Sequence, residues 1–280
     1  MNIRMIESLI MNKMSGMTAP DILLYDEITS TNDVLGQMAA DDLQLKEGTI
    51  VAALSQTKGK GRRGRSFFSP DNAGLYFSIL LKPQIPFEEA LIITPMAAVA
   101  VYESIKELFG IELSIKWVND LYCENRKICG ILAESDVKVI EGIIYPKYVI
   151  LGMGINLFDT GAYVPDDIAD KYGTLFGMKD SRLANSYAQK GREYVIADLI
   201  DKLYEKITFH YGKLAERNFM STYRSASMLT GKKVSYVSGN LKKELMVLDI
   251  DNDGALICRD NSGEIKAYRD GEINLTGWSL

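Results

Sequence analysis

The sequence predicts an α+β fold, in which a mixed β-sheet packed with helices is followed by a small C-terminal β-barrel. The first observation is that apolar strands and helices with a period near 3.6 residues alternate as far as residue 225. The second is that short strands then follow, separated by the turn sequences SGN, DNDG and NSG. We therefore expect three segments: a lead-in over 1–20, a main domain over 21–225 and a barrel over 226–280.

In chain order, the cap-type residues Thr29–Asp33 predict a helix that reaches Ala40. A longer helix is expected over 88–109, with Pro95 in an early turn, where proline is best tolerated, and another over 192–223. Strands of the main sheet are expected at 48–56, 75–83, 113–117, 121–123, 127–135, 137–145 and 148–155. Strands of the barrel are expected at 232–237, 243–250, 255–259 and 264–269.

Composition argues against several classes of function. The 280 residues carry a net charge of −5, which is not typical of a general nucleic-acid-binding surface. No apolar run approaches the roughly 20 residues of a membrane span. His210 is the only histidine, which argues against Ser-His-Asp chemistry and histidine zinc sites. The three cysteines are odd in number and lack metal-type spacing, so we expect buried thiols in a reducing cytoplasm.

A basic loop over Lys58–Arg65 stands out against this acidic background. It holds five cations together with Gly59, Gly61 and Gly64. Glycine lets backbone N–H groups approach a ligand, and guanidinium groups match phosphate oxygens. We expect the loop to be mobile until an anion neutralises it. A solvated surface loop is the alternative.

Two local patterns resemble known motifs but lack their context. The glycines of the basic loop spell G-x-G-x-x-G, but a strand follows where a dinucleotide-binding motif needs a helix. Asp249, Asp251 and Asp253 match the start of a calcium loop, but their flanks are strands, so a hairpin turn is expected.

Three further segments suggest a site. The sequence KWVNDLY ends a strand, Lys127 stands in the apolar run KICGIL, and LGMGIN places two glycines and an amide at another strand end. Each has a structural explanation: core, turn or close strand packing. Their occurrence together with the basic loop favours function.

These segments resemble those of the biotin protein ligase family. The matching motifs are STN (30–32), SQTKGKGRRGR (55–65), KWVND (116–120), RKICGILAE (126–134) and GMGIN (152–156), in the family's order and spacing. The close match covers about residues 22–160. It implies a class II synthetase-like catalytic domain and an SH3-like barrel. Departures stand at Val118, Lys60 and Phe67, where the family usually has Pro, often Arg and often Trp.

The resemblance implies two half-reactions. Biotin and ATP give biotinyl-5′-AMP and pyrophosphate, and a lysine of a biotin carboxyl carrier domain then displaces AMP. Mg²⁺ is expected on the ATP phosphates, with no certain metal site on the protein.

The resemblance also assigns roles to residues. The implied catalytic residues are Lys127, Arg62 and Asp120. Those implied to bind biotin are Ser30, Thr31, Asn32, Gln56, Lys60, Gly61, Arg62 and Lys127. Those implied to bind the nucleotide are Arg62, Arg63, Arg65, Trp117, Asn119, Gly154 and Asn156.

The resemblance is to a monofunctional enzyme, because about 20 residues precede the match, too few for a DNA-binding domain. We expect no sequence-specific DNA binding and no membrane contact, and a homodimer is possible. One alternative is a lipoate or octanoate ligase or transferase of the same fold. Another is a non-catalytic module that binds nucleic acid or a phosphoprotein.

Overall fold

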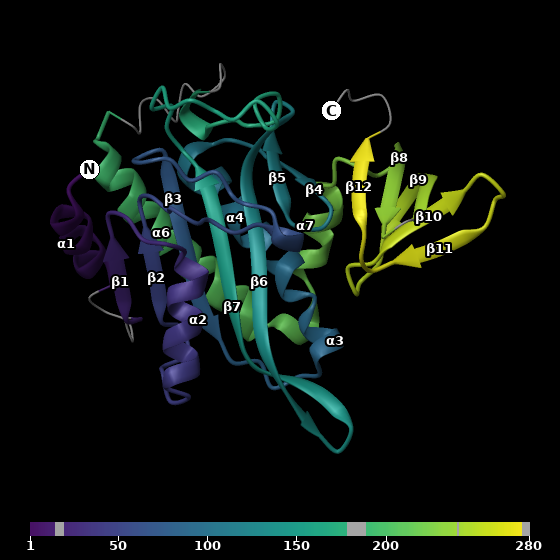
Figure 1. The fold of residues 1–280 in the computed structure, drawn as a ribbon, viewed down its shortest axis with the longest axis horizontal. Helices are drawn as coiled ribbons and strands as arrows, with labels where there is room; N and C mark the ends of the chain where they lie inside the picture. The colour runs from purple at the N-terminus through teal and green to yellow at the C-terminus, as the bar shows by residue number, and fades with distance from the viewer. Residues whose placement is uncertain (15–19, 178–188, 240, 276–280) are drawn as a thin grey trace.

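The computed structural model describes residues 1–14, 20–177, 189–239 and 241–275 (Figure 1). Its larger part is a seven-stranded mixed sheet in the order β1-β2-β3-β7-β6-β5-β4. The strands are β1 Ile22–Tyr25, β2 Ile50–Ala53, β3 Gly74–Leu81, β4 Ser114–Lys116, β5 Asp120–Cys123, β6 Arg126–Ile140 and β7 Ile143–Asn156. Only β1 and β2 pair in parallel.

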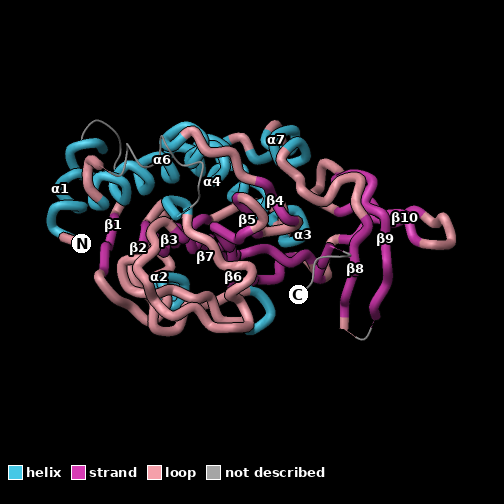
Figure 2. The backbone as a smooth tube through the Cα atoms, turned by 90° about the horizontal axis from the view of Figure 1, so that it is seen from above, coloured by secondary structure: helices cyan, strands magenta, loops and turns pink. Residues whose placement is uncertain are grey.

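Helices cover both faces of this sheet (Figure 2). One face packs against a layer that includes α4 and α6, with α1 beyond α6, and the other face carries α2. The helices are α1 Ile3–Met14, α2 Thr31–Asp41, α3 Phe87–Ala90, α4 Ile93–Phe109, α6 Arg192–Gly212 and α7 Phe219–Ser225. Short 3-10 turns lie at Arg62–Gly64, Leu175–Gly177 and Leu214–Glu216.

The C-terminal part is a five-stranded antiparallel sheet in the order β11-β10-β9-β8-β12. Its strands are β8 Lys233–Ser238, β9 Leu241–Ile250, β10 Leu256–Asp260, β11 Ile265–Tyr268 and β12 Glu272–Leu275. The last of these was not expected from the sequence. The α+β prediction is confirmed, whereas the domain limits at residues 20 and 225 stay a prediction.

Three expected elements are interrupted. The helix expected over 88–109 breaks before α4, because the ring of Pro95 would clash with the carbonyl group of Leu91. The helix expected over 192–223 ends at Gly212, and Arg217 adopts a left-handed φ of 55°. The strand expected over 137–145 is a hairpin that turns at Glu141 and Gly142, both with positive φ.

Other expectations are met. The aspartates after β9 form a hairpin turn, in which the Asp251 carboxylate accepts hydrogen bonds from the Asp253 and Ala255 amides. The basic loop leads into β3, so the dinucleotide motif is excluded. Cys129 and Cys258 are buried, but Cys123 is only half-buried. Within the described ranges, no helix is both long and apolar enough to cross a membrane.

Candidate active site

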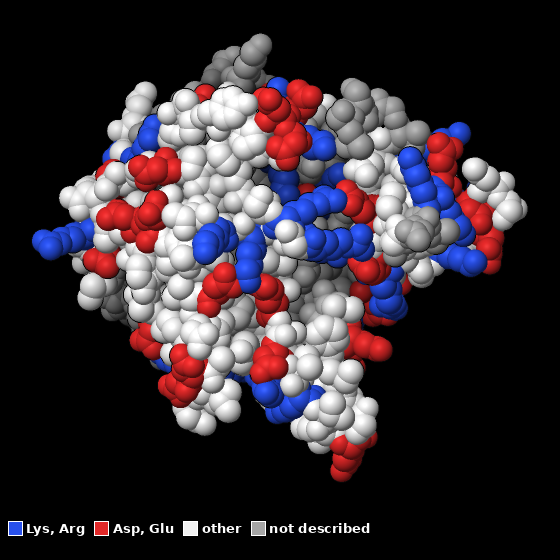
Figure 3. Space-filling view, viewed as in Figure 1, with Lys and Arg blue, Asp and Glu red and all other residues white. Residues whose placement is uncertain are grey.

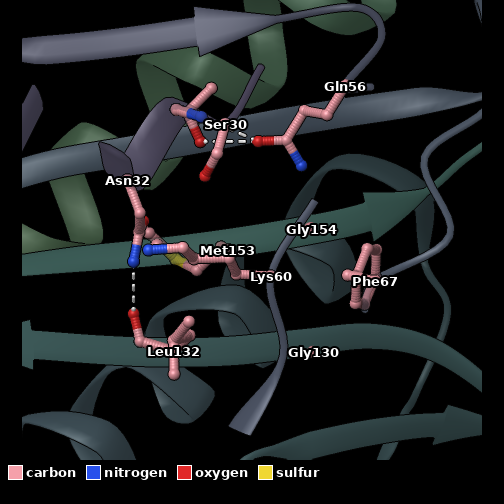
Figure 4. A pocket seen from close by; sticks show the side chains of 11 residues that line it. Ser30, Asn32, Gln56, Lys60, Phe67, Gly130, Leu132, Met153 and Gly154 are labelled. Atoms are coloured by element: carbon pink, nitrogen blue, oxygen red, sulfur yellow. Dashed lines mark hydrogen bonds between the residues drawn. The ribbon is translucent and has the colours of Figure 1, made fainter. Parts of the chain in front are cut away.

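The face of the main sheet beside α2 is hollow because two strand positions lack side chains. Tyr148 and Ile150 of β7 pack with the apolar side of α2, but the next positions on that face are Gly152 and Gly154. A Cβ atom at Gly152 would collide with the Asn32 side chain, so the start of α2 lies directly on the strand. This leaves a first pocket that is open to the surface, with about 300 Å³ of space when the adjoining solvent is included (Figure 4).

Polar groups of the first pocket are held in fixed orientations. Ser30 caps α2, and its hydroxyl accepts a hydrogen bond from the Asp33 amide. The Thr31 amide donates to Gln56 Oε1 at 2.8 Å, and the Gln56 amide nitrogen donates to the Ser69 hydroxyl. These bonds orient Thr31 and Gln56 before any ligand binds.

The Lys60 side chain crosses the rim of this pocket. Its ammonium group pairs with Asp33 and lies 3.5 Å from Glu134 Oε1. The hydrogen bond with Asp33 outweighs burial and raises the pKa of Lys60. Asn32 donates to the same Glu134 at 2.8 Å, so one carboxylate ties the basic loop to the start of α2.

A second pocket of about 700 Å³ lies beside the first, between the main sheet and β12. Its lining includes Arg62, Arg63 and Arg65 of the basic loop together with Lys116 and Lys127, against the two carboxylates of Asp120 and Glu272. Figure 3 shows Lys and Arg side chains gathered around a hollow in this face of the molecule. Such a concentration of positive charge is suited to a polyphosphate.

The basic loop is a compact turn. The Gly61 amide donates to the Arg65 carbonyl at 2.7 Å, and Lys60 and Ser66 form a β-bridge. Arg63 and Gly64 both have positive φ, which turns the chain at its tip.

Lys127 reaches the second pocket because β6 contains a bulge. Leu121 pairs with Cys129 but Tyr122 pairs with Lys127, so Ile128 is an extra residue. Ile128 and Cys129 are both buried in the core, and Lys127 therefore returns to the face that carries Gly130. Its ammonium group lies 2.8 Å from Asp120 Oδ1, and its side chain is 28% exposed.

Asn119 links the second pocket to the basic loop. Its side-chain amide donates to the Ile131 carbonyl at 2.8 Å and its oxygen accepts from Arg62 at 3.4 Å. The preceding Trp117 donates to the Gly254 carbonyl, and the Tyr223 hydroxyl donates to the Val118 carbonyl. The turn that carries Asn119 and Asp120 is therefore fixed by both α7 and the C-terminal sheet.

The two pockets share the ring of Phe67 as a wall. The ring lies where side chains at Gly130 and Gly154 would otherwise stand. The Lys127 ammonium group is 5.6 Å from the centre of this ring. A ligand of each pocket would thus meet the other near Phe67 and Lys127.

The structure brings most of the residues assigned from the sequence together, but not always in the expected pocket. Ser30, Thr31, Asn32, Gln56 and Lys60 line the first pocket, as does Gly154, which was assigned to the nucleotide. The second pocket is lined by Gly61, Arg62, Arg63, Arg65, Trp117, Asn119, Asp120 and Lys127. Asn156 lines neither: it is buried, its amide donates to the Lys127 carbonyl, and its Oδ1 accepts no bond from any described residue.

Some lining residues were not assigned from the sequence. Lys116 stands in the KWVND motif. That it lines the second pocket follows from its half-buried position in the fold and could not be inferred from the sequence. Burial lowers the pKa of Lys116, and the nearby Lys127 adds to this effect, although Asp120 opposes it. Glu272 comes from β12, and no pattern in the sequence connects it to the basic loop.

Among the described residues, no cluster of three or more His, Cys, Asp or Glu side chains could hold a metal ion. Carboxylate and amide oxygens suited to Mg²⁺ are present as Asp120 and Asn119 in the second pocket.

Comparison with known proteins gives consistent results. Residues 25–156 match the model of the Biotin/lipoate A/B protein ligase family. The chain is 29% identical to the bifunctional ligase/repressor BirA of Bacillus subtilis, over 88% of this chain and 72% of that protein. It is 25% identical to the biotin–[acetyl-CoA-carboxylase] ligase of Mycobacterium tuberculosis, over 87% of this chain and 85% of that protein. The biotin protein ligase of Aquifex aeolicus, solved with biotin and ATP, superposes with a TM-score of 0.69 at 27% identity, covering 91% of this chain and 98% of that one.

Proposed function

We propose that this chain, which belongs to the Biotin/lipoate A/B protein ligase family, is a biotin protein ligase that uses ATP to attach biotin to a lysine of a carrier protein. The observation that carries the proposal is the arrangement of the two pockets. A pocket lined by polar side chains adjoins a cationic pocket, and Phe67 and Lys127 stand where they meet. The first pocket takes biotin and the second takes ATP.

In the first half-reaction, the biotin carboxylate attacks the α-phosphorus of ATP. A new oxygen–phosphorus bond forms, the bond to the β-phosphate oxygen breaks, and pyrophosphate leaves. The carboxylate is ionised at neutral pH, so it needs no general base. The obstacle is repulsion between two anions, which Lys127 and the arginines of the basic loop reduce.

Each group then has a role that its position supports. Ser30, Thr31 and Gln56 bind the ureido ring, and Lys60 covers the bound acid. Arg62, Arg63, Arg65 and Lys116 contact the phosphates. Lys127 stabilises charge at the junction of carboxylate and α-phosphate. Mg²⁺ carried by ATP neutralises part of the charge on the phosphates, and Asp120 and Asn119 supply nearby oxygen atoms.

In the second half-reaction, the acceptor lysine attacks the biotinyl carbonyl carbon and AMP leaves. The amine must lose a proton, and Asp120 is placed to receive or orient it, because it lies beside Lys127 in the second pocket.

The rival activities receive less support. A non-catalytic module predicted a solvated Lys127, but this ammonium group is paired with Asp120 inside a pocket. A lipoate or octanoate ligase shares the family, and ATP–pyrophosphate exchange measured with each acid separates it from a biotin ligase. Three further proposals rest on the sequence: action on a biotin carboxyl carrier protein, a homodimer and a cytoplasmic location.

The proposed activity is tested by incubating the protein with biotin, ATP and Mg²⁺. We expect biotinyl-5′-AMP in the mass spectrum and biotin-dependent exchange of pyrophosphate into ATP. If octanoate or lipoate supports exchange and biotin does not, the substrate assignment is wrong. If no acid supports it, the proposed chemistry is wrong.

The basic loop is also expected to act as a lid. Bound biotin and ATP would bury the loop from the protease, so trypsin cleavage within Lys58–Arg65 is expected to slow by about tenfold or more. Cleavage at the exposed Lys138, at the far end of β6, provides the control. Equal cleavage of the loop with and without ligands would contradict a lid.

A further inference from the structure

The arginines assigned to the phosphates are already paired with carboxylates. Arg63 lies 2.8 Å and Arg62 3.5 Å from the same oxygen, Asp270 Oδ1. Arg65 lies 2.5 Å from Glu272 Oε2. Asp270 and Glu272, here called the acidic pair, therefore contact all three guanidinium groups of the basic loop.

The acidic pair stands on a well-anchored segment. The Tyr236 hydroxyl donates to the Asp270 carbonyl at 3.0 Å, and Glu272 pairs with Val237 across the C-terminal sheet. Gly271 has a φ of 136°, and a Cβ there would collide with the Tyr236 ring. The C-terminal sheet thus fixes the backbone that carries the two carboxylates, although the Asp270 side chain itself is 70% exposed.

Both carboxylates remain charged. Burial opposes their ionisation, but the Gly271 amide and Arg63 outweigh it and lower the pKa of Asp270. Arg65 likewise outweighs burial and lowers the pKa of Glu272. At neutral pH the acidic pair presents two negative charges to the pocket that must receive a triphosphate.

We propose that Asp270 and Glu272 are positioning residues that hold the three loop arginines in the empty enzyme and compete with the ATP phosphates for them. This inference rests on the proposed function, because it assigns the arginines to ATP. A carboxylate and a phosphate use the same guanidinium N–H groups, so ATP must displace the acidic pair before it binds fully. The acidic pair also repels the incoming polyanion. Together these effects set the KM for ATP and leave the biotin pocket unaffected.

The test is the double variant D270N/E272Q, with E264Q as the matched control. Glu264 belongs to the same C-terminal sheet region and pairs only with Lys266 among the ion pairs of the described residues, so E264Q removes a charge without touching the loop. KM for ATP is measured by pyrophosphate exchange at saturating biotin, and Kd for biotin by calorimetry. We expect the double variant to show a KM for ATP about three- to tenfold lower than wild type at low salt, with kcat within about twofold.

Further measurements separate positioning from a structural role. The difference in KM is expected to shrink as salt is raised from about 50 mM to about 500 mM, because exposed charges are screened. The single variant D270E keeps the negative charge, so its KM for ATP should equal that of the wild type. The Kd for biotin and the melting temperature of the double variant should match those of E264Q.

Two negative results would overturn different proposals. An unchanged or raised KM for ATP in a folded double variant overturns the competition, even if the wild type exchanges pyrophosphate normally. Absence of exchange in the wild type instead overturns the proposed function on which the inference rests.

Discussion

Replacement of Lys127 by alanine is expected to slow the formation of biotinyl-5′-AMP by about 10²- to 10³-fold, the usual effect of removing one group that stabilises developing charge. The ammonium group lies between the two pockets, beside Phe67 and 2.8 Å from Asp120. Without it, the carboxylate and the α-phosphate approach each other with Asp120 as an additional negative charge. Single-turnover formation of the adenylate, followed by mass spectrometry, measures the effect.

The same hairpin offers a matched control. Lys147 on β7 pairs with Asp136 at 2.8 Å, the same separation as Lys127 and Asp120, but neither Lys147 nor Asp136 lines the first or the second pocket. Lys147→Ala removes the same side chain from a more exposed ion pair of the same length and should leave adenylate formation unchanged. If Lys127→Ala retains full activity, or if both variants lose activity equally, Lys127 has no special role.

Asp120→Asn is expected to act mainly on the second half-reaction. Transfer from preformed biotinyl-5′-AMP to the carrier should slow by about 10- to 100-fold, because a nearby base no longer helps the acceptor amine to lose its proton. Adenylate formation should change less, since its nucleophile is already ionised. Rapid-mixing assays of each half-reaction, with Asp136→Asn as the control, separate the two.

The pH dependence gives a second readout for Asp120→Asn. A free lysine has a pKa of about 10.4, so each unit of pH below that value lowers the neutral fraction about tenfold. Transfer by the variant should therefore rise more steeply with pH than transfer by the wild type. If adenylate formation is slowed more than transfer, Asp120 does not act on the acceptor amine.

Local chemistry made much of the fold predictable. Ser30 appears as a cap in the sequence and caps α2 in the structure, and the glycine-separated strands after Ser227 form the second sheet. Errors arose where one residue overrode a periodic pattern. The apolar period continued through Pro95 and through Glu141–Gly142. Pro95 lies in the first turn of α4, as expected, but its ring prevents one continuous helix from 88 onward, and the Glu-Gly pair turns the chain.

The composition of the site was also accessible from the sequence, because its chemistry depends on residue types. A chain with one histidine, a concentrated basic loop and a lysine in an apolar run has the groups for joining two anions. Which pocket each group faces was less accessible. Gly154 lines the first pocket, whereas Gly61 and Arg62 line the second pocket, because the loop turns at Arg63 and Gly64.

The sequence by itself determined which cations and glycines form the site and in what order along the chain the strands that carry them follow one another. Only the tertiary structure decided where Lys127 points. Lys127 and Gly130 are three residues apart, so a regular strand would place them on opposite faces. The extra residue Ile128 brings both to the face of the sheet that carries the two pockets. Only the tertiary structure could likewise bring Asp270 and Glu272 to arginines more than 200 positions earlier, since such contacts follow from packing one sheet beside another and leave no local pattern.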